Sequence, residues 1–155
     1  MAVDRGGRPY SAFNFLVQID GGPDARGDWR AGFQEVSGLG MEITVAEYRA
    51  GSFKDNTPMK VTGTYKVPDV TLKRGVVGDL NTLYAWLNAV RNGQQDQLKE
   101  VTIMLLDEQR TETPVQTWRL KGARPTKYTG PSLSGKSTDV AIEELVLACE
   151  RIDVE

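Results

Sequence analysis

The amino-acid sequence predicts a mainly β fold, an antiparallel β-sandwich or barrel with one flanking α-helix. Two observations lead to this prediction. Most apolar residues alternate with polar ones over short runs bounded by glycine, proline or asparagine, a pattern typical of half-buried strands. Only one segment, about residues 80–91, repeats its apolar residues with a helical period. The 155 residues contain no internal repeat and no linker, so we expect a single domain over residues 1–155.

The N-terminal part is expected to hold an arm and three strands. Residues 1–12 are rich in glycine and charge and are expected to form a flexible arm. Phenylalanine, valine and isoleucine alternate with polar residues over 13–20, which predicts a strand. Residues 29–36 and 41–49 are predicted to be two further strands, joined by the Ser-Gly-Leu-Gly segment at 37–40.

The segment over residues 50–60 is polar and contains Gly51 and Pro58. It is longer than the roughly 2–5 residues of a tight hairpin turn, so we expect an extended loop. Short strands are predicted after it, at residues 60–65 and 69–73.

The helical segment repeats its apolar residues on one face. These residues are Leu80, Leu83, Tyr84, Leu87 and Val90, with Trp86 beside them. Asp79 is expected to cap the first turn, and Gly93 stands where a glycine commonly ends a helix. We expect Leu83, Tyr84, Trp86 and Leu87 to pack onto one sheet.

The C-terminal part is predicted to contain further strands at residues 100–107, 115–121 and 123–129. Residues 138–154 are ambiguous. Val140, Ile142, Val146 and Ile152 alternate as in a strand, whereas the local composition around residues 141–145 weakly favours a helix.

The missing residue types exclude several classes of site. The chain has no histidine, which removes the commonest general base and metal ligand. Cys149 is the one cysteine, so neither an internal disulfide nor a thiolate zinc site can form, and its apolar surroundings favour a buried, unreactive thiol. We therefore expect no enzyme activity, no cofactor and no metal.

One catalytic motif matches by sequence. Residues 130–137 fit the G-x-x-x-x-G-K-[ST] pattern of a phosphate-binding loop, and residues 101–107 resemble an apolar strand ending in a magnesium-binding aspartate. The context does not fit, because the preceding segment is polar and contains Pro125. Only one helix is predicted in the whole chain. We favour a Gly/Ser loop between two strands and expect no binding of ATP there.

Charge is distributed unevenly along the chain. Residues 49–75 carry a net charge of +4, residues 139–155 a net charge of −5, and the whole chain −2. The basic segment could contact nucleic acid, but two segments of opposite sign favour self-association. The adjacent carboxylates Glu143 and Glu144, like Asp107 and Glu108, would point to opposite faces of a strand and form no acid–base pair. We expect them to be solvated or to contact another subunit.

The order of these segments resembles a known family. Residues 32–49 read GFQEVSGLGMEITVAEYR and residues 70–75 read VTLKRG, after the opening strand and before the helix with Trp86. The segment 118–123, with Pro125 and Lys127, and then residues 140–143 complete the series. The chain resembles, over about residues 10–153, the tail tube proteins of contractile-tailed phages and extracellular contractile injection systems.

The resemblance implies a structural protein with a ring-forming tail-tube fold. It implies homohexameric rings that stack head to tail into the hollow inner tube of a tail or injection apparatus, and strand rather than helix over residues 138–152. Expected partners are a contractile sheath protein, baseplate or tube-initiator proteins, a tube-terminating cap and luminal cargo, either protein effector or DNA. Sheath contraction would drive the tube into the target envelope.

Alternatives from other classes remain. They are a type VI secretion tube protein, a monomeric β-barrel that binds a small ligand, and an enzyme using residues 130–137. No secretory signal and no span long enough for a membrane anchor is evident, so we expect synthesis in the cytoplasm and assembly into a virion tail or tail-like particle.

The extended loop is the candidate ring-stacking surface. Its cations and apolar side chains are expected to meet an acidic face of the next ring, supplied by residues 139–155. The candidate residues are Arg49, Phe53, Lys54, Met59 and Lys60.

Overall fold

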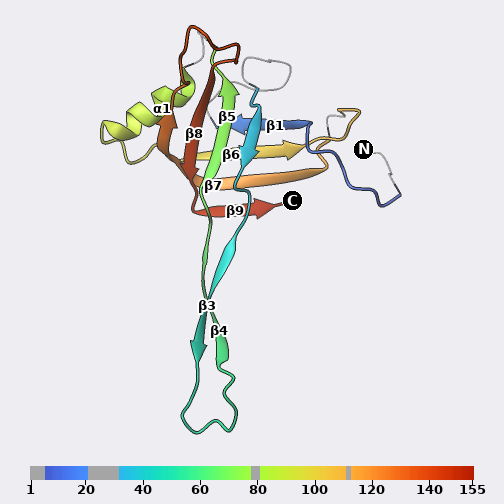
Figure 1. The fold of residues 1–155 in the computed structure, drawn as a ribbon, viewed down its shortest axis with the longest axis vertical. Coiled ribbons are helices and arrows are strands. Elements are labelled where there is room, and N and C mark those ends of the chain that lie inside the picture. The colour runs from blue at the N-terminus through green and yellow to red at the C-terminus, as the bar shows by residue number, and fades with distance from the viewer. Residues whose placement is uncertain (1–5, 21–31, 78–80, 111–112) are drawn as a thin grey trace.

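A computed structural model describes residues 6–20, 32–77, 81–110 and 113–155. Described strands and the helix follow the predicted order (Figure 1). They are β1 (Phe15–Ile19), β2 (Glu35–Ser37), β3 (Glu42–Tyr48), β4 (Met59–Lys66), β5 (Val70–Gly75), α1 (Thr82–Arg91), β6 (Lys99–Leu105), β7 (Gln116–Thr129), β8 (Ile142–Ala148) and β9 (Arg151–Val154). The mainly β fold with one flanking helix is therefore confirmed for the described residues.

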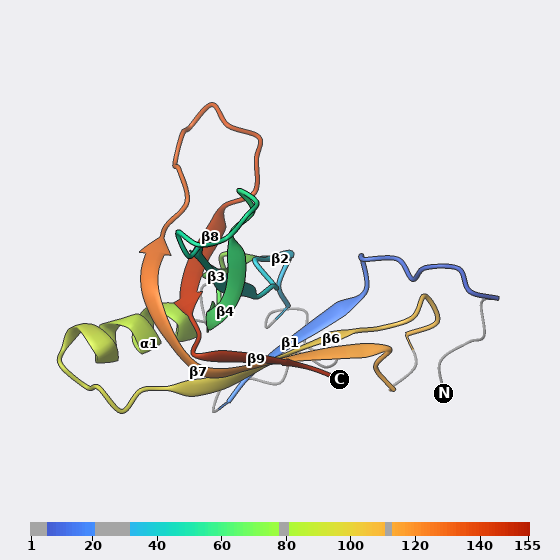
Figure 2. The same ribbon diagram turned by 90° about the horizontal axis from the view of Figure 1, so that it is seen from below.

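A seven-stranded antiparallel sheet forms the body, in the order β1-β6-β7-β8-β5-β2, with β9 also paired to β7. The sheet bends at β7 into two layers whose strands cross at a steep angle (Figures 1 and 2). The first half of β7 pairs with β6 and β9, and its second half pairs with β8. The sheet is not closed into a barrel, since β1, β2 and β9 each pair with one described strand.

The bend lies where two separate strands were expected. Residues 116–121 and 123–129 belong to the single strand β7, which continues through Gly122 at a φ of +63°. This left-handed conformation suits glycine, and the pairing of β7 shifts by one residue on each side of the bend. One strand can thus serve both layers of the body.

The hydrophobic core lies between the two layers and under the helix. It contains Val17, Val70, Leu72, Leu83, Trp86, Val101, Ile103, Leu120, Ala123, Leu145, Leu147 and Ile152. Alternate residues of β5 and β8 are buried, as the period of a strand requires. Residues 142–148 and 151–154 are strands, so the local helix propensity of residues 141–145 does not decide the structure.

Helix α1 begins later than the apolar period suggested. Its N-cap position is Asn81, and Asp79 lies outside the described residues, so the prediction that Asp79 caps this helix was wrong. Gly93 follows the end of α1, as expected, and has a φ of +91°. Its N–H donates a hydrogen bond to the Val90 carbonyl over 3.1 Å. Leu83 and Trp86 are buried and Leu87 is half-buried, but Tyr84 is exposed, against expectation.

Strands β3 and β4 form a separate two-stranded sheet that projects far from the body (Figure 1). Ten residues, 49–58, connect them at the far end. The predicted strand over residues 29–36 lies partly outside the described residues, and its described part contributes only β2.

Candidate functional site

The projecting hairpin exposes an unusual amount of apolar side chain. Every residue of β3 and β4 is exposed. Half of the exposed large apolar side chains in the described part of the chain lie within residues 41–65. They are Met41, Ile43, Val45, Tyr48, Met59, Val61 and Tyr65. An isolated two-stranded hairpin is only marginally stable in water, and a concentration of exposed apolar side chains usually marks an interface.

A bulge places this apolar surface on both faces of the hairpin. Ile43 pairs with Tyr65, and Tyr48 pairs with Met59, but the pairing shifts by one residue between these points. Residues 43 and 48 lie on opposite faces of β3, and paired residues share a face. Near the body the apolar pair therefore lies on one face, and near the tip it lies on the other. A single neighbouring layer could not cover both.

The segment between the two strands is internally ordered by Arg49. Its Nε and Nη2 atoms donate hydrogen bonds to the Asp55 carbonyl over 3.1 and 2.9 Å, and Nη2 also donates to the Phe53 carbonyl over 3.1 Å. The Thr57 N–H donates to the Asp55 carboxylate over 2.7 Å. These hydrogen bonds give the long connection a defined shape.

The five candidate residues lie together at this end of the hairpin. Phe53 is half-buried, and the other four are exposed. Lys54 and Lys60 make no ion pair with any residue that the structure describes. Residues 48–60 are hereafter called the hairpin tip; they combine free positive charge with the exposed apolar side chains of Tyr48 and Met59.

The acidic and basic segments are partly neutralised within the body. Arg74 on β5 is buried against Glu143 on β8, and Lys73 lies 3.9 Å from Glu35. The expectation that the paired carboxylates are solvated or contact another subunit was wrong for Glu143, which is 5% exposed and ion-paired inside the chain. It was also wrong for Asp107, which is buried. The Tyr128 hydroxyl donates to the second carboxylate oxygen of Glu143 over 2.8 Å. Burial raises the pKa of Tyr128, and this hydrogen bond raises the pKa further.

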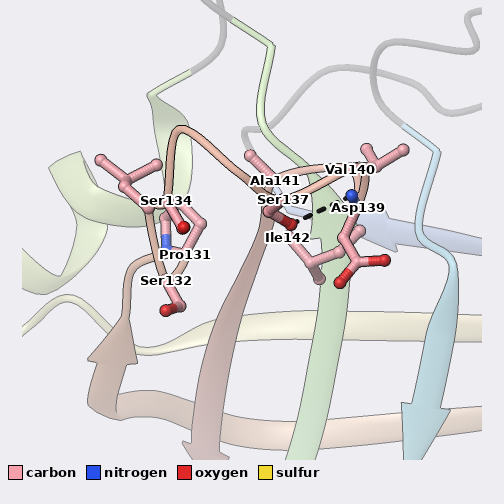
Figure 3. A pocket seen from close by; sticks show the side chains of 9 residues that line it. Pro131, Ser132, Ser134, Ser137, Asp139, Val140, Ala141 and Ile142 are labelled. Atoms are coloured by element: carbon pink, nitrogen blue, oxygen red, sulfur yellow. Dashed lines mark hydrogen bonds between the residues drawn. The ribbon is translucent and has the colours of Figure 1, made fainter.

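A second candidate surface is the connection between β7 and β8. Residues 130–141, hereafter the β7–β8 loop, contain no helix, so the strand–loop–helix frame of a phosphate-binding P-loop is absent from this segment. The loop and the start of β8 enclose an open hollow of about 330 Å³ (Figure 3). Its walls include Pro131, Leu133 and Val140, with serine hydroxyls and Asp139 around them.

Two further observations concern site chemistry. In residues 6–20, 32–77, 81–110 and 113–155, no group of three or more cysteine or acidic side chains is arranged to hold a metal ion. Within the same ranges, no helix is long and apolar enough to cross a membrane.

Sequence reasoning located the hairpin tip but missed two features. The alternation in residues 41–49 indicated a strand without indicating that both of its faces are exposed. The hollow of the β7–β8 loop was also missed, although the separation of Leu133 from Val140 by polar residues was a possible signal.

Comparison with protein families identifies one match. The family of the T4-like virus tail tube protein gp19 matches residues 11–153. Comparison with curated proteins gave no match.

Several solved structures have the same fold, and one of them is part of an extracellular contractile injection system. A chain in the anti-feeding prophage tube-terminating cap is 28% identical with a TM-score of 0.80, covering 100% of this chain and 94% of that one. A chain in the PVC sheath–tube complex of an extracellular contractile injection system, in the extended state, is also 28% identical with a TM-score of 0.80, covering 99% of each chain. Hcp1 from Flavobacterium johnsoniae is 13% identical with a TM-score of 0.53, covering 90% of this chain and 93% of that one, which shows the fold alone.

Proposed function

The chain belongs to the family of the T4-like virus tail tube protein gp19, and we propose that it forms homohexameric rings that stack head to tail into a hollow inner tube. It is a structural tube protein of a contractile tail or injection apparatus. The observation that supports stacking most strongly is the β3–β4 hairpin, which exposes apolar side chains on both faces and projects from a well-packed body.

Ring formation would use the open edges of the body. β1, β2 and β9 each have one described neighbour in the sheet, so each can pair with a strand of another copy. Exposed edges are an aggregation hazard in a monomer, and closing a ring of identical copies removes them. The continuous sheet produced in this way would surround the channel of the tube.

Ring stacking would use the hairpin tip. Phe53 and Met59 supply apolar contacts, while Lys54 and Lys60 supply positive charge toward the adjacent ring. Arg49 acts through the backbone of the tip, because its guanidinium group donates to the Phe53 and Asp55 carbonyls. Stacking is a heterologous contact, so the surface that receives the tip need not resemble it.

The proposed partners follow from the relatives. The similar chains occur in a sheath–tube complex, in a tube-terminating cap and in a baseplate, which supports a sheath, a cap and a baseplate or initiator as partners of this chain. Protein effectors or DNA would pass through the channel, and sheath contraction would drive the tube into the target envelope. We propose synthesis in the cytoplasm, without a signal peptide, before assembly into a virion tail or tail-like particle, and a purely structural role without enzyme activity.

Tube assembly by variants of the hairpin tip tests this function. Phe53→Ala should reduce tube length at any salt concentration, because apolar contacts are not screened. Lys54→Glu with Lys60→Glu should reduce it most at low salt, where repulsion between charges is strongest. Gln95→Glu, an exposed change beyond helix α1, is the control and should leave tubes unchanged.

Sedimentation and electron microscopy would measure both effects, and circular dichroism would check the fold of each variant. Full-length tubes from both tip variants would show that the hairpin tip does not join the rings. A protein that remains monomeric over a wide range of concentrations, even with baseplate components present, would contradict ring formation itself.

A further inference from the structure

The hairpin tip and the β7–β8 loop lie at opposite ends of the molecule. In Figure 1 the tip is the lowest point of the long axis, and the β7–β8 loop rises above the body at the other end. Figure 2, seen from the tip side, shows that the loop also extends outward past the body. When identical copies stack head to tail, features at opposite ends of one copy become neighbours across the junction.

The β7–β8 loop exposes apolar side chains that no described part of the chain covers. Leu133 is 83% exposed and Val140 is 75% exposed, the two highest values among the large apolar side chains. Both border the hollow of about 330 Å³, which opens to solvent between the two limbs of the loop (Figure 3). A side chain of the size of methionine or phenylalanine fits a hollow of this kind.

The charges of the two surfaces are complementary. Asp139 borders the hollow, and its carboxylate makes no ion pair with any described residue; only its N–H is bonded, to the Ser137 hydroxyl over 3.1 Å. Lys54 in the hairpin tip is likewise free of described ion pairs.

We infer that the hairpin tip of one copy docks into the hollow of the β7–β8 loop of a second copy in the adjacent ring. Met59 or Phe53 contacts Leu133 and Val140, and Lys54 approaches Asp139. This assignment rests on the proposed stacking of rings through the hairpin tip. It names the receiving surface as residues 130–141, of which only residues 139–141 belong to the acidic segment 139–155 expected from the sequence.

The same loop carries the phosphate-binding pattern, and the inference gives those residues a different role. Its glycines and serines, with Pro131, shape an exposed connection whose two limbs stand apart. Lys136→Ala should therefore alter tube assembly only slightly. Neither the parent nor this variant should bind ATP.

Charge exchange between the two surfaces is the first test. Lys54→Glu and Asp139→Lys should each raise the critical concentration for tube assembly by about tenfold at low salt, because every copy around the ring loses the pair. The double variant Lys54→Glu with Asp139→Lys restores the opposite charges and should return the value to within about threefold of the parent.

The outcomes separate the inference from the function on which it rests. If Lys54→Glu impairs assembly while Asp139→Lys does not, the tip joins the rings and the β7–β8 loop is not its receiver. If neither variant changes assembly, the proposed docking is wrong, and Phe53→Ala then decides whether the tip joins the rings at all. If both variants impair assembly and the double variant is no better, the two residues do not face each other.

Disulfide trapping is the second test and needs no change in affinity. In a Cys149→Ala background, Lys54→Cys with Asp139→Cys should form intermolecular disulfides in assembled tubes after mild oxidation, and not in disassembled protein. Lys54→Cys with Gln95→Cys is the matched control and should not cross-link. If the variant with Lys54→Cys and Asp139→Cys forms normal tubes but no cross-links, the proposed docking is wrong.

Discussion

Arg74 on β5 and Glu143 on β8 form an ion pair inside the body, with the Arg74 Nε donating to a Glu143 carboxylate oxygen over 2.5 Å. Arg74 is 2% exposed and Glu143 5%. The Phe33 ring lies 5.7 Å from the guanidinium carbon, and the Tyr128 hydroxyl binds the other carboxylate oxygen. Two charges taken out of water are tolerated because each contacts the other and the remaining polar atoms have partners.

Removing one member of this pair should be costly. Glu143→Gln leaves the buried guanidinium group without its carboxylate and should lower the free energy of unfolding by about 3–5 kcal/mol. The double variant Arg74→Met with Glu143→Leu removes both charges and should cost much less. Urea denaturation of unassembled protein measures both values; a Glu143→Gln variant as stable as the parent would show that the pair contributes nothing.

Gly38 should resist substitution far more than Gly40, two residues away in the segment that leads from β2 to the hairpin. Gly38 has a φ of +88°, and an added Cβ would lie 2.2 Å from the Asp69 carbonyl oxygen, whereas a Cβ at Gly40 meets nothing within 4 Å. Gly38→Ala should therefore cost at least about 2 kcal/mol and Gly40→Ala less than about 0.5 kcal/mol. Thermal unfolding of the two variants provides the comparison, and equal melting temperatures would rule out the close approach at Gly38.

Residues on helix α1 should differ in their contribution to stability. Trp86 is 4% exposed and donates its indole N–H to the Gln97 carbonyl over 2.8 Å, so Trp86→Ala should cost about 3–5 kcal/mol. Tyr84 is exposed and contacts the Tyr128 ring edge-on at 6.1 Å, so Tyr84→Ala should cost no more than about 1.5 kcal/mol. Chemical denaturation would reveal an error in this packing if the two costs were the same.

The single thiol should react slowly. Burial, followed by the negative charge of Asp69, raises the pKa of Cys149 to about 11 from an ordinary value of 9.0. At pH 8 a thiol reagent should therefore modify folded protein much more slowly than urea-unfolded protein, and the rate should continue to rise from pH 9 toward pH 11. A rate that levels off by pH 9 would be inconsistent with this shift.

The raised pKa of Cys149 also makes the stability of the folded protein depend on pH. The folded state holds the Cys149 proton more tightly than the unfolded state, so this stabilising contribution is complete below pH 9 and is lost between pH 9 and about 11. Tyr128 acts in the same direction, because its pKa is also raised. Cys149→Ala should make the loss of stability over this interval smaller, and an unchanged pH dependence would assign the loss to other groups.

Much of the fold could be predicted because it depends on local patterns. Alternation identified strands close to β1, β3, β5 and β6, and the apolar period identified α1. The bend of β7 could not be predicted in this way, because both of its halves have an ordinary strand pattern and the backbone conformation of Gly122 decides their connection. Residues 141–145 show the converse, since pairing with β5 and β7 overrides their helix propensity.

The candidate site could be predicted only in part. The length and charge of residues 50–60 identified the hairpin tip, but the bulge between β3 and β4 depends on how the two strands pair and cannot be seen in either strand alone. Burial of Glu143 depends on Arg74, 69 residues earlier in the chain, so local sequence offered no signal for it. Tyr84 was assigned to the buried face because a helical stripe does not indicate which of its edges the body covers.

Cryo-electron microscopy of tubes assembled from the purified protein tests the central claim most directly. We predict stacked hexameric rings in which residues 48–60 of each copy cross the junction and contact residues 130–141 of a copy in the next ring. Tubes in which the hairpin contacts only copies of its own ring, or points into solvent, would contradict the account.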